Sequence, residues 1–114
     1  MKPLRGPFPL THESIASQVA GRSGVYALGY ISANGRFCTN AVGRADGNLR
    51  ERLSHHIGIE REFKFVPLSS VIESFEAECR LFHSLSPLKT RVHPARPTGA
   101  DVTCLICGGS RAPR

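Results

Sequence analysis

The spacing of apolar residues along the chain predicts three helices and three strands. Apolar positions that recur every three or four residues are typical of a helix with one buried face, whereas alternating or β-branched and aromatic runs are typical of strands. Asn34-Gly35 is a strong signal for a tight turn and therefore predicts a hairpin. The expected helices cover 12–20, 49–57 and 71–85, and the expected strands cover 24–31, 36–42 and 62–68.

An acidic residue interrupts the apolar face of the helix predicted over 71–85. At about 100° per residue, one side of this helix carries Val71, Phe75, Phe82 and Leu85. Glu78 lies in the same stripe, roughly 40° from Phe82. Taking a carboxylate out of water costs several kcal/mol unless a cation or hydrogen-bond donors compensate it. Either a buried ion pair with an arginine from elsewhere or a role as hard-cation ligand in a cleft explains the position.

The composition indicates one small, basic, folded domain. The chain has 114 residues, with 15 Lys and Arg against 9 Asp and Glu, which gives a formal net charge of +6. An excess of this size favours a polyanionic partner, nucleic acid above all, over a basic surface that serves solubility alone.

The N-terminal and C-terminal segments differ in composition from the centre. Residues 1–22 are expected to cover an edge of a core formed by 23–85, and 86–114 form a Pro- and Gly-rich tail of the same domain. No apolar run approaches the roughly 20 residues of a membrane span, and three prolines interrupt the N-terminus, which is unlike a signal peptide. We therefore expect a cytoplasmic protein.

Cysteines and histidines near the C-terminus predict a structural zinc site. The tail contains a C-x-x-C pair, which is half of a tetrahedral site, and the last helix offers a cysteine and a histidine one turn apart. Four of the five residues Cys79, His83, His93, Cys104 and Cys107 are expected to bind the ion and pin the tail to the helix. A redox pair, a disulfide or small core residues are the alternatives, and Cys38 in a strand is expected to belong to the core.

Motifs in the centre of the chain resemble those of the GIY-YIG endonuclease superfamily. The resemblance covers about 23–83 and rests on Gly24-Val25-Tyr26, Ala41-Val42-Gly43, Arg52, His56 and Glu78, in this order. The tail, with His93-Pro94 and its cysteine pair, is similar to a small bacterial branch of that superfamily. The resemblance implies an α+β domain with a three-stranded antiparallel sheet flanked by helices, and metal-dependent hydrolysis of DNA phosphodiesters.

The resemblance also implies a role for each matched residue. Glu78 would hold a single Mg²⁺ or Mn²⁺ ion, and Arg52 would bind a phosphate oxygen and stabilise the transition state. Tyr26 and His56 would orient or deprotonate the attacking water. Further DNA contacts are expected from Arg44, Asn48 and Arg50.

One position departs from the family pattern. The second motif normally begins with a tyrosine, often proposed as the general base, and this chain has Ala41 there. Either Tyr26 and His56 cover the proton transfer, or the domain is a weak or inactive nuclease that serves as a zinc-stabilised DNA-binding module. We favour retained activity because Tyr26, Arg52, His56 and Glu78 are all present.

Overall fold

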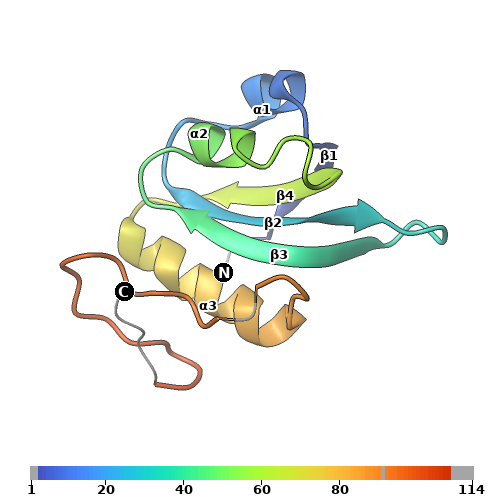
Figure 1. The fold of residues 1–114 in the computed structure, drawn as a ribbon. Coiled ribbons are helices and arrows are strands. Elements are labelled where there is room, and N and C mark those ends of the chain that lie inside the picture. The colour runs from blue at the N-terminus through green and yellow to red at the C-terminus, as the bar shows by residue number, and fades with distance from the viewer. Residues whose placement is uncertain (1–2, 91, 109–114) are drawn as a thin grey trace.

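The computed structural model describes residues 3–90 and 92–108, which form an antiparallel sheet with helices around it (Figure 1). In chain order the elements are β1 (Arg5–Pro9), α1 (His12–Gln18), β2 (Gly24–Ile31), β3 (Phe37–Ala45), α2 (Leu49–Ser54), β4 (Glu62–Pro67) and α3 (Val71–Leu85). The strands lie in the order β1-β4-β2-β3, and every pairing is antiparallel. The fold is a small α+β domain with an open four-stranded sheet.

The expectation of three strands was wrong because the proline-rich N-terminal segment adds β1 to the sheet. β1 pairs with β4, and its register shifts between Arg5 and Phe8. Proline cannot donate a ladder hydrogen bond, so a strand that contains Pro7 and Pro9 is tolerated at a sheet edge. β1 occupies such an edge, and β3 occupies the other.

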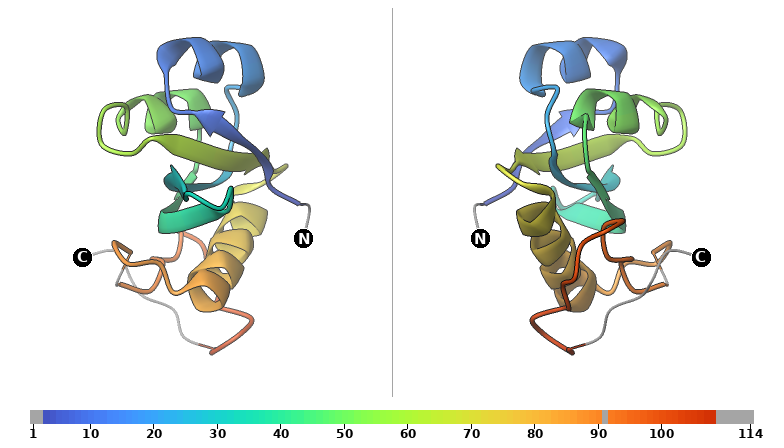
Figure 2. Two further views of the ribbon diagram at one scale, coloured as in Figure 1. Left: turned by 90° about the vertical axis from the view of Figure 1, so that its right-hand side faces the viewer. Right: turned by 90° about the vertical axis from the view of Figure 1, so that its left-hand side faces the viewer.

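The helices pack on opposite faces of the sheet (Figures 1 and 2). α1 and α2 cover one face through a core that contains Ile15, Val19, Tyr26, Leu28, Leu49, Leu53, Phe63 and Phe65. α3 covers the other face, where Val25, Ala27, Val42, Val66, Leu68, Ala77 and Leu81 form a second core. Among the helices of the described residues, none is long and apolar enough to cross a membrane.

Polar caps and turns set the ends of the elements. Thr11, Asn48 and Ser70 each accept a hydrogen bond from the first turn of the helix they precede. α2 ends at Ser54, earlier than expected, because the chain turns there and Gly58 follows with a φ of 89°. The hairpin connection spans 32–36, longer than the expected two-residue turn, and the backbone N–H of Ser32 donates to the carbonyl of Arg36 at 2.8 Å.

β3 continues past the glycine that was expected to end it. Gly43 lies opposite Tyr26 of β2, and the pairing runs on to Gly24 and Ala45. A Cβ at Gly43 would lie 2.5 Å from the Tyr26 hydroxyl oxygen and 2.6 Å from Cζ of the same ring. The absent side chain therefore lets the tyrosine ring cross the edge strand β3 and reach the rim of the sheet.

Gly43→Ala is expected to destabilise the protein by about 1–3 kcal/mol and to displace the Tyr26 ring, because the added methyl group overlaps it. Thermal and denaturant unfolding would measure the loss. Gly47→Ala is the matched control, since no atom lies within 4 Å of the Cβ it would add. Equal stability of the two variants would contradict this packing.

Candidate active site and metal cluster

A cleft of about 270 Å³ lies at the outer edge of β3. Its walls come from β2, β3, α2, α3 and the tail, and they consist of Tyr26, Gly43, Arg44, Asp46, Arg52, Glu78 and Ala95. Three of the four residues to which the sequence assigned catalytic roles therefore share one cleft. The fourth, His56, is joined to it by a hydrogen bond of 3.3 Å between its Nε2 and the Tyr26 hydroxyl.

Burial shifts the pKa values of Tyr26 and His56 in the directions that keep both side chains neutral. Burial raises the pKa of Tyr26 to about 12, against the effect of the nearby Arg52 charge and with a contribution from Glu78. Burial also lowers the pKa of His56, as do the charges of Arg52 and His55, whereas Glu60 opposes this shift. A neutral imidazole can accept a proton, and a tyrosine hydroxyl with so high a pKa is a donor rather than a base. The pair is suited to proton transfer with His56 as the acceptor.

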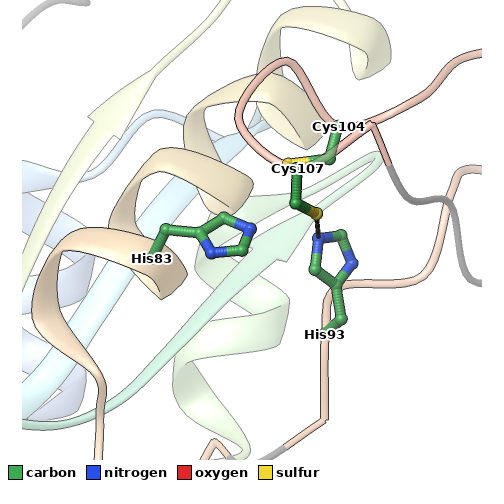
Figure 3. A group of neighbouring side chains, drawn as sticks. All are labelled: His83, His93, Cys104 and Cys107. Carbon is green, nitrogen blue, oxygen red and sulfur yellow. Dashed lines mark hydrogen bonds between the residues drawn. The ribbon is translucent and has the colours of Figure 1, made fainter.

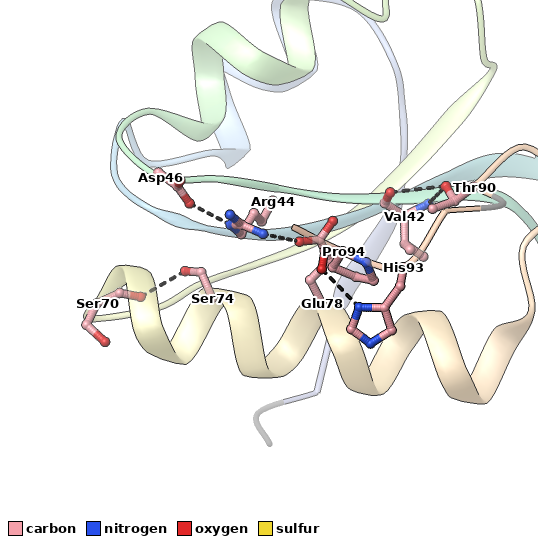
Figure 4. A network of polar contacts seen from close by, with 9 residues as sticks. All are labelled: Val42, Arg44, Asp46, Ser70, Ser74, Glu78, Thr90, His93 and Pro94. Carbon is pink, nitrogen blue, oxygen red and sulfur yellow. Dashed lines mark hydrogen bonds and ion pairs between the residues drawn. The ribbon is translucent and has the colours of Figure 1, made fainter. Parts of the chain in front are cut away.

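Glu78 is buried and forms an ion pair with Arg44 (Figure 4). Only 8% of Glu78 is exposed, and its Oε1 lies 2.7 Å from Nη1 of Arg44. The Nε of the same guanidinium lies 2.7 Å from Oδ1 of Asp46, and the group sits 5.6 Å from the centre of the Phe75 ring. Burial raises the pKa of Glu78 even though Arg44 opposes the shift. One of the two sequence-based explanations, the ion pair with an arginine, is therefore confirmed.

The ion pair leaves part of the Glu78 carboxylate for another partner. Among the described residues, only Oε1 of Glu78 accepts a hydrogen bond, and the carboxylate lines the cleft. The guanidinium of Arg52 lines the same cleft and forms no ion pair within 3–90 and 92–108. A carboxylate oxygen and a free guanidinium across one cleft can bind a cation and a phosphate oxygen together.

The three residues expected to contact DNA have contacts within the chain. Arg44 is held by Glu78 and Asp46, and the side chain of Asn48 caps α2 by accepting from the backbone N–H groups of Arg50 and Glu51. Arg50 donates to the backbone carbonyls of Val19 and Ala16, which ties α2 to α1. These contacts account for the side chains without DNA, and their role at a DNA surface stays a prediction.

A second group of polar side chains lies where α3 meets the tail (Figure 3). Ligand atoms of His83, His93, Cys104 and Cys107 all lie within 4.8 Å of one another, so the group could hold a metal ion. Nε2 of His83 is buried and has no hydrogen-bond partner among the residues that the structure describes, which is costly unless a ligand meets it. The Sγ of Cys107 lies 3.5 Å from Nε2 of His93.

Among the five cysteine and histidine candidates, Cys79 is the one outside this group. It is buried beside Phe75 and Cys104, and burial with the neighbouring Cys104 thiol raises its pKa to about 12. Burial also acts to raise the pKa of Cys104, but hydrogen bonds from the backbone N–H groups of Cys107 and Ile106 and from His93 lower it to about 6. The thiolate is the form that binds metals, so the lowered pKa of Cys104 agrees with its place in the cluster, and Cys79 lies outside the cluster.

Cys38 does not belong to the core, contrary to expectation. It is half-buried on β3 opposite Tyr30, and its thiol contacts the backbone carbonyl of Arg36 at 3.8 Å. Cys38 lies near the turn of the hairpin, and that end of the hairpin extends beyond the helices that cover the sheet.

Comparisons of this chain with protein-family models, with curated proteins and with solved structures give no match. What the chain does must therefore be inferred from the cleft and the cluster themselves. Both gather residues that are far apart in sequence, and each mixes chemistry that a hydrophobic core does not need: a carboxylate with arginines in one, thiols with imidazoles in the other.

Sequence reasoning missed three residues of the cleft. Arg44, named only as a DNA contact, compensates the charge of Glu78, and Asp46 orients it from the loop after β3. Ala95 completes the wall from the tail. Arg44 and Glu78 are 34 residues apart and lie on different elements, so no local spacing signals their contact. The available hint was a charged residue between the buried Gly43 and Ala45 of β3.

Without added divalent ions, Glu78→Gln is expected to stabilise the protein progressively, relative to wild type, as the pH rises. Burial raises the folded-state pKa of Glu78 above its ordinary value of 4.5, so folding favours the protonated carboxyl. The stability contributed by that proton is present below pH 4.5 and is lost as the pH rises through the raised pKa. Glutamine removes this dependence, while Asp46 still pairs with Arg44.

Melting temperatures of both proteins between about pH 4 and about pH 8 would measure the effect. Glu76→Gln removes the same charge from the same helix outside the cleft and should keep the wild-type profile. Parallel profiles for wild type and Glu78→Gln would contradict the assignment of a destabilising buried charge.

Proposed function

We propose that this chain is a metal-dependent endonuclease that hydrolyses DNA phosphodiester bonds. The observation that carries the proposal is the convergence of Tyr26, Arg52 and Glu78 on one cleft, with His56 bonded to the tyrosine. These residues come from β2, α2 and α3, and a structural role alone does not require them to share an opening to solvent. The net charge of +6 supports a polyanionic substrate.

The residues of the cleft have separate roles in this proposal. Arg52 binds a non-bridging phosphate oxygen, because this residue lines the cleft and forms no ion pair among the described residues. His56 accepts the proton of the attacking water through the Tyr26 hydroxyl, since its lowered pKa keeps the imidazole neutral near pH 7. Tyr26 orients that water.

Glu78 is the residue that would hold Mg²⁺ or Mn²⁺. Hard divalent cations prefer carboxylate oxygens, and one oxygen of Glu78 is left over by the Arg44 ion pair. When bound, the ion would neutralise charge on the scissile phosphate and on its leaving oxygen. Arg44 keeps the carboxylate in place, and Asp46 and the Phe75 ring in turn fix Arg44.

A zinc-stabilised DNA-binding module without strong nuclease activity is the second candidate. Ala41 is the observation that favours it, because it stands at the position where the resembling family has a tyrosine. Its side chain packs against the core under α1 and α2 and offers no hydroxyl. In that case DNA would bind with strong salt dependence and remain intact.

Plasmid nicking with Mg²⁺ or Mn²⁺ separates the two candidates. The wild type is expected to nick, and Glu78→Gln is expected to lower the rate by about a hundredfold or more, because the divalent ion loses its ligand. Glu76→Gln, which leaves the cleft intact, should nick like the wild type. Cleavage that survives Glu78→Gln would refute the assigned site, and binding without cleavage by the wild type would favour the module.

We further propose that the ion at His83, His93, Cys104 and Cys107 is zinc. Two thiolates and two imidazoles are the donor set of tetrahedral structural zinc sites, and the orphaned His83 nitrogen fits the need for a fourth ligand. Thiols stay reduced in the cytoplasm, where we place the protein. The ion would join the last turn of α3 to both halves of the tail.

Purified protein is therefore expected to contain about one equivalent of zinc per chain. His83→Gln should lower the content below about half an equivalent, because three ligands hold the ion far less tightly than four. His12→Gln, an exposed histidine at the start of α1, is the control and should keep its zinc. Elemental analysis after gel filtration measures the content, and a zinc-free wild type would contradict the proposal.

A further inference from the structure

We propose that the ion bound by the cluster of His83, His93, Cys104 and Cys107 shapes the wall of the cleft, so that binding of the catalytic ion at Glu78 depends on it. The two sites would bind different kinds of ion. The thiolate and imidazole ligands of the tail suit a soft ion that holds the cleft wall in place, and the carboxylate of the cleft suits a hard ion that takes part in hydrolysis. This inference rests on the proposed function for its link to cleavage. The expected effect on ion binding rests on contacts between the cluster and the cleft.

The tail itself connects the cluster to the cleft. Ala95 lines the cleft only two residues after the ligand His93, and Pro94 between them is buried. Upstream, Lys89 and Thr90 attach the tail to β3: the backbone N–H of Lys89 donates to the carbonyl of Asn40 at 2.7 Å, and the backbone N–H of Val42 donates to the Thr90 hydroxyl at 3.0 Å. Downstream, Cys104 is buried beside Phe75 and Cys79. The ion would add a restraint at His93, two residues before Ala95, and its loss would remove that restraint from the cleft-lining segment.

The second contact runs behind the ion pair of the cleft. Cys104 packs in one buried group with Phe75 and Cys79, and it is 1% exposed. The Phe75 ring supports the guanidinium of Arg44, which holds Glu78. A movement of Cys104 would therefore open space behind Phe75 and loosen the support of the carboxylate that is to bind the divalent ion.

The third contact is the nearness of a cluster residue to the buried carboxylate. His93 and Glu78 both lie on the side of the sheet that α3 covers (Figure 4). If His93 moves when the ion leaves, the shape of the cleft wall beside Glu78 changes. Outer supporting groups of this kind typically change metal affinity or activity by about 10–100-fold.

The test measures Mn²⁺ binding in the cleft against zinc content in the tail. Full-length wild type with zinc, wild type stripped of zinc, and Cys107→Ser are titrated with Mn²⁺ by electron paramagnetic resonance, and Glu78→Gln defines the signal that belongs to the cleft. We expect loss of zinc to weaken this Glu78-dependent binding by about tenfold or more, and re-addition of zinc to the stripped wild type to restore it. Cys38→Ser, a thiol outside the cluster, should bind both ions like the wild type.

Amide hydrogen exchange on the same samples decides whether the effect is local. The expected result is lost protection at the tail amides of Ala100 and Gly108, which donate to the carbonyls of Pro97 and Cys104, with unchanged protection in β2 and β4. Mn²⁺ binding that ignores zinc content would overturn the inference. Unfolding of the whole sheet on zinc loss would overturn it too, because the ion would then serve overall folding. If zinc-dependent Mn²⁺ binding is observed and wild type cuts no DNA, the inference stands and the nuclease proposal fails.

Discussion

The buried carboxylate of Glu78 is the constraint on which the site depends. A carboxylate inside an apolar helix face is costly, and this chain reduces the cost with a single guanidinium from the neighbouring edge strand. Asp46 and the Phe75 ring then hold that guanidinium in place. Because burial still raises the pKa of Glu78, the compensation is incomplete. A second cation at the remaining oxygen would complete it, and this is the physical basis of the proposal that Glu78 binds a metal ion.

The edge strand β3 brings together groups that belong to opposite faces of the sheet. Tyr26 and Arg52 belong to the side of α2, whereas Glu78 arrives from α3 on the other side. They can share a cleft only at the rim, where Gly43 leaves room for the tyrosine ring to cross the strand. The chain thus gives up a side chain in its sheet and tolerates a buried charge in its longest helix, both within one cleft.

Elements with strong local signals could be predicted from the sequence, and contacts across the sheet could not. α3 and β2 begin and end where periodicity and β-formers place them. β1 was missed because its prolines argue against a strand unless an edge is free beside β4. The four candidate site residues came from the family resemblance, and three of them line one cleft. The pairing of Arg44 with Glu78 depends on tertiary packing that no spacing reveals.

The candidate metal cluster shows the same division. The C-x-x-C pair and the histidine of α3 can be recognised in the sequence, but the choice between Cys79 and His93 depends on how the tail returns across the helix. Cys79 is buried in the group with Phe75, and His93 comes within reach of Cys107 instead. The tail contributes three of the four residues that could hold a metal ion, and α3 contributes one.

We propose that a divalent ion binds the buried carboxylate of Glu78 in the cleft. Crystals soaked in Mn²⁺, with anomalous diffraction data collected near the manganese edge, would show whether it does. An anomalous peak is expected in the cleft at coordination distance from the Glu78 carboxylate oxygen that does not pair with Arg44. No peak in the cleft, while Arg44 still pairs with Glu78, would show that the ion pair is purely structural.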